Sequence, residues 1–105
     1  MSAQRRRIEY IRCVDYKAEE LDKQGYNVKA NIGGWSTPPT ILGMIPDLRA
    51  KRGNKVIIGK MVREDFDINA AEFTKFMEYA KKDENTSFRV YLISETGKPT
   101  LYKIY

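Results

Sequence analysis

Apolar residues recur at spacings of three and four along residues 4–24, with charged side chains between them. The members of this stripe are Ile8, Ile11, Val14, Ala18 and Leu21. This is the period of an amphipathic helix, and Gly25 supplies a stop signal. A second stripe, after the acidic segment 65–67, consists of Phe73, Phe76, Met77 and Ala80. Carboxylates suit the N-terminus of a helix, so the pattern predicts two helices.

Five segments carry the residue pattern that is typical of strands. They are 26–32, 41–51, 55–62, 87–93 and, as a last short strand or an edge segment, 100–105. The turn at Arg52-Gly53-Asn54 joins the second and third segments into a hairpin. The segment 33–40, with two glycines and two prolines, continues neither a helix nor a strand. We therefore expect an exposed loop there.

The order of elements is helix, three strands, helix, then one or two strands. A run of strands between two helices predicts an α/β chain of the α+β-like kind, in which helices flank a mixed sheet. The helix after the third strand also serves as a crossover that makes the next strand parallel to an inner one. With 105 residues the chain has the length of one domain, residues 1–105.

Composition narrows the chemistry that this chain can perform. It contains no histidine and one cysteine, Cys13, which excludes an internal disulfide, a Cys/His zinc site and catalysis that depends on an imidazole. No apolar run approaches the roughly 20 residues of a membrane span, and no signal-peptide segment is seen, so we expect a cytoplasmic protein. The 19 basic and 14 acidic residues give a net charge of +5, which favours polyanions such as DNA.

Three short motifs give the chain a resemblance to a known superfamily. They are Ile45-Pro46-Asp47-Leu48, the Gly53-Asn54 turn and Val56-Ile57-Ile58. Over roughly residues 4–93 the chain resembles small archaeal and bacterial members of the restriction-endonuclease-like, PD-(D/E)xK superfamily. The resemblance implies a core of helix, three strands, helix and strand. It also implies descent from nucleases that depend on Mg²⁺ or Mn²⁺.

In that superfamily an aspartate on the second strand and an acidic residue on the third hold the metal, and a nearby lysine helps to activate water. Asp47 matches the first position, both as a metal ligand and as a catalytic residue. The triplet on the third strand reads Gly59-Lys60-Met61, so the second carboxylate is missing and methionine replaces the lysine. Strand alternation sends Lys60 to the face opposite Met61, so a catalytic Lys60 requires a bulge.

Some superfamily members recruit the acidic ligand from a helix. Glu20, Glu64 and Glu72 are the candidates here, with Glu20 and Glu72 the preferred metal ligands beside Asp47. The alternative for each is a charged side chain on the surface, and Glu72 has Lys75 three residues further along the helix.

A nucleic-acid-binding surface is expected beside this site. Trp35, in the loop 33–40, either stacks on a base or folds back onto the core or a dimer contact. The hairpin contributes Arg49, Lys51, Arg52 and Lys55, which either contact phosphates or are simply solvated.

Three functions remain open from the sequence. The first is a catalytically degenerate domain that binds nucleic acid or a partner protein. The second is an active endonuclease that uses Mg²⁺ or Mn²⁺ with migrated ligands. The third is a non-catalytic homodimer that pairs through the edge segment 100–105, where Leu101, Ile104 and Tyr105 are apolar.

Overall fold

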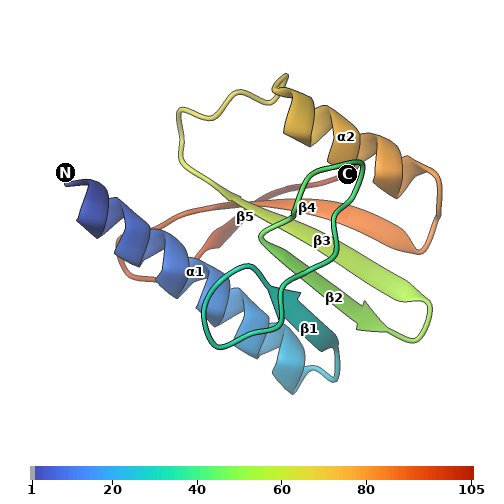
Figure 1. Cartoon of the computed structure of the whole chain (residues 1–105), viewed down its shortest axis with the longest axis horizontal. Coiled ribbons are helices and arrows are strands. Elements are labelled where there is room, and N and C mark those ends of the chain that lie inside the picture. The colour runs from blue at the N-terminus through green and yellow to red at the C-terminus, as the bar shows by residue number, and fades with distance from the viewer. Residues whose placement is uncertain (1) are drawn as a thin grey trace.

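The computed structural model describes residues 2–105 and contains two helices and five strands (Figure 1). The elements are α1 (Ala3–Lys23), β1 (Asn27–Ala30), β2 (Leu48–Arg52), β3 (Lys55–Val62), α2 (Ala71–Lys81), β4 (Thr86–Leu92) and β5 (Thr100–Ile104). This order confirms the predicted α+β arrangement, and the last segment is a strand.

The five strands form one mixed sheet in the order β1-β2-β3-β4-β5. The pairs β1–β2, β2–β3 and β4–β5 are antiparallel, whereas β3 and β4 are parallel. A parallel pair cannot be closed by a tight turn, and α2 provides the crossover between β3 and β4. The crossover that the sequence predicts is therefore confirmed.

Each helix covers its own face of the sheet and its own apolar core (Figure 1). Successive side chains of β3 alternate between the two cores. Ile57 and Met61 pack with the buried residues of α1, whereas Ile58 and Val62 pack with those of α2. Because β3 is buried on both faces, its near-continuous apolar run is that of a central strand.

The bounds of α1 follow from local signals. The Ser2 hydroxyl accepts a hydrogen bond from the Arg5 amide at 3.2 Å and caps the N-terminus. Gly25 has a φ of 89°, a backbone conformation that glycine adopts readily, and it follows the helix as predicted. Among residues 2–105, neither helix is both long and apolar enough to cross a bilayer.

The second strand is shorter than its pattern predicts. The segment 41–47 lies outside the sheet, and Ile41 and Met44 close a tight turn through an isolated bridge. Leu42 in this turn has a φ of 51°, and Pro46 has no amide to donate to a ladder. Ile41 is nevertheless buried in the core beneath α2. This burial explains why an apolar residue stands at this position, as it would in a strand.

Candidate functional site

Asp47 is a buried carboxylate at the point where β2 begins. Its side chain is 4% exposed. The Oδ2 atom accepts a hydrogen bond from the backbone amide of Met61 at 2.7 Å, and Oδ1 accepts one from the hydroxyl of Tyr10. Groups from α1, the start of β2 and β3 therefore converge on this carboxylate.

Lys60 lies directly across the hairpin from Asp47. Leu48 pairs with Gly59, and the Asp47 amide donates to the Gly59 carbonyl at 3.0 Å, so the next position outward on β3 is Lys60. The Lys60 Nζ atom is 3.7 Å from Asp47 Oδ2. The structure thus brings Asp47 and Lys60 together within a regular register, without the bulge that we expected a functional Lys60 to require.

A second carboxylate completes the group from the first turn of α2. Glu72 Oε2 is 3.4 Å from Lys60 Nζ, so one ammonium group contacts both Asp47 and Glu72. The Glu72 side chain is 37% exposed, whereas that of Lys60 is only 19% exposed. Lys60 therefore acts as an internal cation between the two acidic groups.

The other two acidic candidates lie elsewhere. Glu20 pairs with Lys17 at 2.5 Å, and it is ten residues beyond Tyr10, which is about 15 Å along the axis of α1. That distance separates Glu20 from the carboxylate that Tyr10 contacts. Glu64 is exposed after the end of β3. Within residues 2–105, no three acidic or cysteine side chains gather as a metal-binding cluster.

The space beside Gly59 is filled by Leu48. A Cβ atom built on Gly59 would lie 2.7 Å from Cγ and 2.9 Å from Cδ1 of Leu48, which is fully buried. Real Cβ atoms do not come this close to a neighbour. A carboxylate side chain at this position would require Leu48 to move. The packing of β2 against β3 therefore depends on a glycine at position 59.

Burial controls the protonation of the site. Desolvation raises the pKa of Asp47 above its ordinary value, while the Lys60 ammonium and the hydrogen bonds from Tyr10 and Met61 act in the opposite direction. The pKa of Tyr10 is raised as well, first by its own burial and then by the charge of Asp47. Tyr10 is thus held as a neutral hydrogen-bond donor.

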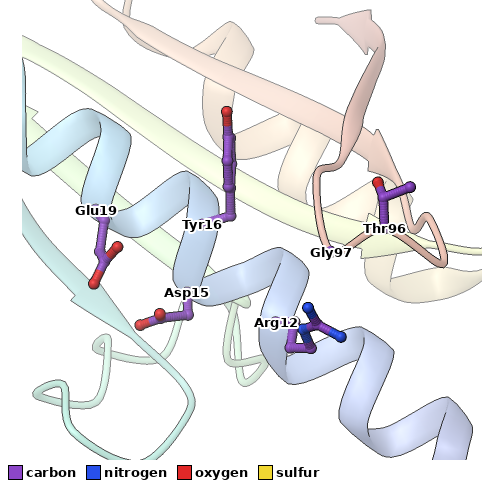
Figure 2. A pocket seen from close by; sticks show the side chains of 6 residues that line it. All are labelled: Arg12, Asp15, Tyr16, Glu19, Thr96 and Gly97. Carbon is purple, nitrogen blue, oxygen red and sulfur yellow. The ribbon is translucent and has the colours of Figure 1, made fainter.

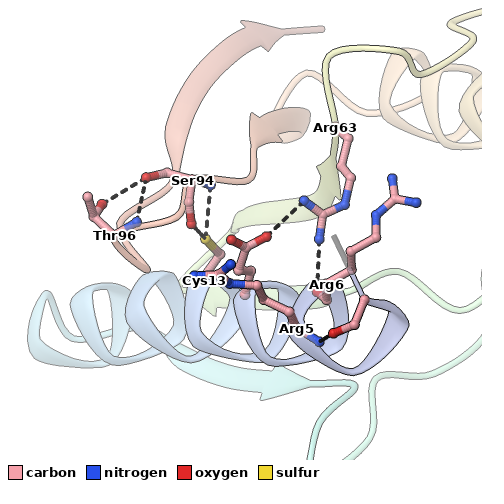
Figure 3. A network of polar contacts seen from close by, with 8 residues as sticks. Arg5, Arg6, Cys13, Arg63, Ser94 and Thr96 are labelled. Atoms are coloured by element: carbon pink, nitrogen blue, oxygen red, sulfur yellow. Dashed lines mark hydrogen bonds and ion pairs between the residues drawn. The ribbon is translucent and has the colours of Figure 1, made fainter.

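A polar network fastens α1 to the far end of β3 (Figure 3). Arg63 Nη1 donates to Glu9 Oε1 at 3.1 Å, and Nη2 donates to the Arg6 carbonyl at 2.8 Å. The Cys13 thiol contacts the backbone of Ser94. Cys13 is buried.

Sequence reasoning missed two contributions of α1. Neither Tyr10 nor the buried Glu9 carried a signal in the sequence that distinguished it from other residues of the helix. Both partners, Asp47 and Arg63, are distant in sequence. No local spacing identifies such contacts.

Trp35 folds back onto α1. Its Nε1–H donates to Asp15 Oδ1 at 2.9 Å, and its ring packs against the core beneath α1. This packing agrees with the alternative in which the indole covers the core.

The basic residues of the hairpin divide between the two sheet faces. Arg52 is held on the α1 side, with Cζ 4.5 Å from the Tyr26 ring centroid and Nη1 donating to the Gln24 carbonyl at 2.6 Å. Lys55, its partner in the register, is exposed.

A row of basic residues lies on the other face. Lys29 pairs with Arg49 across β1 and β2, and Lys51 follows on the same face two residues later. Val28 and Ala50, which alternate with them, are in the core beneath α1. The row therefore faces away from α1.

A small hollow of about 210 Å³ lies between α1 and the turn after β4 (Figure 2). Figure 2 shows Arg12 and Tyr16 rising from α1 toward the segment that carries Thr96. Asp15 and Glu19 also line the hollow, so its acidic groups outnumber its one arginine. This balance disfavours a polyanion.

No protein-family model matches this chain, and no curated protein matches it. The likeness to the restriction-endonuclease-like superfamily therefore rests on the short motifs and on the order of elements. The geometry around Asp47 must carry any conclusion about function.

Proposed function

We propose that this chain is a restriction-endonuclease-like domain that has lost hydrolytic activity and binds nucleic acid. The observation that carries the proposal is the position of Lys60 Nζ, within 4 Å of both Asp47 and Glu72. A divalent ion shared by these carboxylates would have to displace the ammonium group. The chain itself thus supplies a cation between these two carboxylates.

Two further features support the loss of hydrolysis. Leu48 fills the space that an acidic side chain at position 59 would need. Met61 points into the core beneath α1 and contributes only its backbone amide to Asp47. A thioether neither activates water nor stabilises a developing negative charge.

Nucleic-acid binding is supported by charge. The chain has a net charge of +5, and Lys29, Arg49 and Lys51 lie in a row on one face of the sheet. Neutralising phosphates releases counterions, so this binding must weaken steeply as the salt concentration rises. A cytoplasmic location is part of the proposal.

The hydrolytic part is tested by incubating the protein with supercoiled and branched DNA in Mg²⁺ or Mn²⁺. We expect intact DNA with the wild type and with Asp47→Ala. Cleavage by the wild type that disappears in Asp47→Ala would instead support an active endonuclease. In that alternative, Asp47 and Glu72 would hold the metal and Lys60 would assist the reaction.

The binding part is tested by fluorescence anisotropy with labelled DNA at several salt concentrations. We expect binding whose logarithmic dependence on salt has a negative slope. Arg49→Gln combined with Lys51→Gln should reduce the magnitude of this slope. An absence of binding at low salt would refute the nucleic-acid assignment and favour a partner protein.

A homodimer is a second candidate, favoured by the free edge of β5. Leu101 and Ile104 on this strand are 46% and 48% exposed, and paired strand edges commonly close symmetric dimers. Analytical ultracentrifugation should then show a dimer that Leu101→Glu converts to a monomer. A monomer at all concentrations would remove this candidate.

A further inference from the structure

A second hollow forms a groove between α2 and β5. It has a volume of about 560 Å³. Met77 and Lys81 line it from α2, and Tyr102, Lys103 and Tyr105 line it from the C-terminal strand and the residue after it. Figure 1 shows the C-terminus beside α2, in agreement with this lining. The volume falls within the range of roughly 300–1,000 Å³ that is typical of small-molecule sites.

A bulge in the last strand pair brings these side chains together. Val90 pairs with Lys103 and Tyr91 pairs with Leu101, so Tyr102 is the extra residue on β5. Neighbours on a regular strand point to opposite faces, yet Tyr102 and Lys103 both line the groove. Bulges re-aim side chains in this way and are common beside functional sites.

The groove contains an exposed aromatic ring that is held in place by a neighbouring ring. Tyr102 is 52% exposed and makes an edge contact with Phe66, with ring centroids 5.3 Å apart at an angle of 85°. Tyr105 stacks on Phe88 with centroids 5.8 Å apart. Because Tyr102 is half exposed, its ring offers surface on which the flat face of a nucleobase can stack.

The groove also contains cationic groups. Lys81 in the last turn of α2 and Lys103 on β5 line the same groove, with Glu78 as the acidic residue of the lining. The Lys103 Nζ atom is 5.0 Å from the centroid of Tyr105. The hollow beside Arg12 has the opposite balance of charge, which makes the groove the better match for a phosphate.

We propose that this groove binds a nucleotide of a single-stranded nucleic acid, with the base stacked on Tyr102 and the adjoining phosphates near Lys81 and Lys103. The inference rests on the proposed function and specifies its ligand. Bases in a duplex are stacked on one another and are not free to stack on a side chain. The exposed ring therefore selects unpaired strands, which the row at Arg49 and Lys51 does not do.

The test compares a fluorescein-labelled oligothymidine of about 16 nucleotides with a duplex of equal length. We expect the wild type to bind the single strand more tightly than the duplex. Tyr102→Leu should weaken single-strand binding about tenfold or more, whereas Tyr102→Trp should retain it. Tyr16→Leu is the matched control, because Tyr16 is also an exposed tyrosine but lies in the hollow with Asp15 and Glu19.

Charge is tested separately with Lys81→Gln and Lys103→Gln. Each phosphate contact that is lost should reduce the salt slope for single strands by about 0.7. Circular dichroism of every variant verifies the fold. Tyr102→Phe keeps the aromatic ring and removes only the hydroxyl group, so this variant should still bind the single strand.

The outcomes separate the two proposals. Single-strand binding that is the same in Tyr102→Leu and Tyr16→Leu would overturn the groove while leaving nucleic-acid binding in place. Equal affinity of the wild type for the duplex and the single strand would overturn it too. Failure of the wild type to bind either probe would refute the proposed function, and the groove with it.

Discussion

Lys60 lies opposite Asp47 across the β2–β3 hairpin, with Nζ 3.7 Å from Oδ2. The hairpin turn sets this relationship. Gly53 and Asn54 form a two-residue loop, so Arg52 pairs with Lys55 and every later pair follows from that register. The pair thus depends on turn geometry rather than on a motif.

Lys60→Met should destabilise the fold. The buried Asp47 would lose its ammonium partner, and leaving a buried polar group unsatisfied costs about 1–3 kcal/mol, or more when the group is charged. Urea unfolding at neutral pH measures the change. Lys55→Met on the same strand is the control, because Lys55 is exposed and should change the free energy of unfolding by no more than about 0.5 kcal/mol. Equal effects of the two variants would contradict an internal cation.

Gly59→Ala should also destabilise the fold, because its Cβ would lie 2.7 Å from Leu48 Cγ. Overpacking of this kind costs about 1–3 kcal/mol. Leu48→Ala removes the clashing atoms, so the double variant should be more stable than the sum of the single effects predicts. Urea unfolding of the wild type, the two single variants and the double variant gives the free energies for this double-mutant cycle. Strictly additive effects would show that Leu48 does not occupy the space beside Gly59.

Asp47→Asn should change how stability depends on pH. Burial raises the pKa of Asp47 in the folded protein above its ordinary value of 3.8, so the folded state holds this proton more tightly than the unfolded chain. The contribution of Asp47 to the free energy of unfolding is therefore greatest below pH 3.8. It falls as the pH rises through the raised pKa.

The measurement is urea unfolding of the wild type and Asp47→Asn from about pH 3 to about pH 8. The stability of the wild type relative to the variant should decrease across this range, since other groups titrate alike in both proteins. A relative stability that increases with pH would mean that Lys60 and the hydrogen bonds outweigh the burial of Asp47.

Trp35 should report little of nucleic-acid binding. Its indole donates to Asp15 and packs on the core, and it is the only tryptophan in the chain. We expect the emission spectrum of Trp35 to stay unchanged when single-stranded DNA is added. Quenching of the Trp35 emission when DNA binds would instead indicate that Trp35 stacks on a base. Trp35→Phe, which should bind DNA normally, is the companion variant.

Much of the fold was predictable because its periods are local. The stripe of α1 and the alternation of β1 identify their elements without any knowledge of partners. The segment 41–47 was predicted to be part of a strand because of its residue pattern, but in the structure a turn buries Ile41 beneath α2, as a strand could also have done. Composition does not separate these two ways of covering an apolar side chain.

The candidate site was predictable only in part. Asp47 and Lys60 were identified as candidates, but strand alternation was expected to turn Lys60 away unless a bulge intervened, whereas the regular register of the structure places the two residues opposite each other. Tyr10 could not be identified, because a buried carboxylate needs donors but the sequence does not say which tyrosine supplies one. Glu72 meets Lys60 only because α2 crosses the sheet at that point.

The crossover formed by α2 has a consequence for the order in which the chain folds. A hairpin closed by two residues forms in microseconds, whereas the parallel pairing of β3 with β4 must wait for a longer loop to close. We therefore expect Asp47 and Lys60 to meet while much of the polypeptide is still unstructured, and Glu72 to join them later. Substitutions in the hairpin should slow refolding, whereas substitutions at Glu72 should mainly accelerate unfolding.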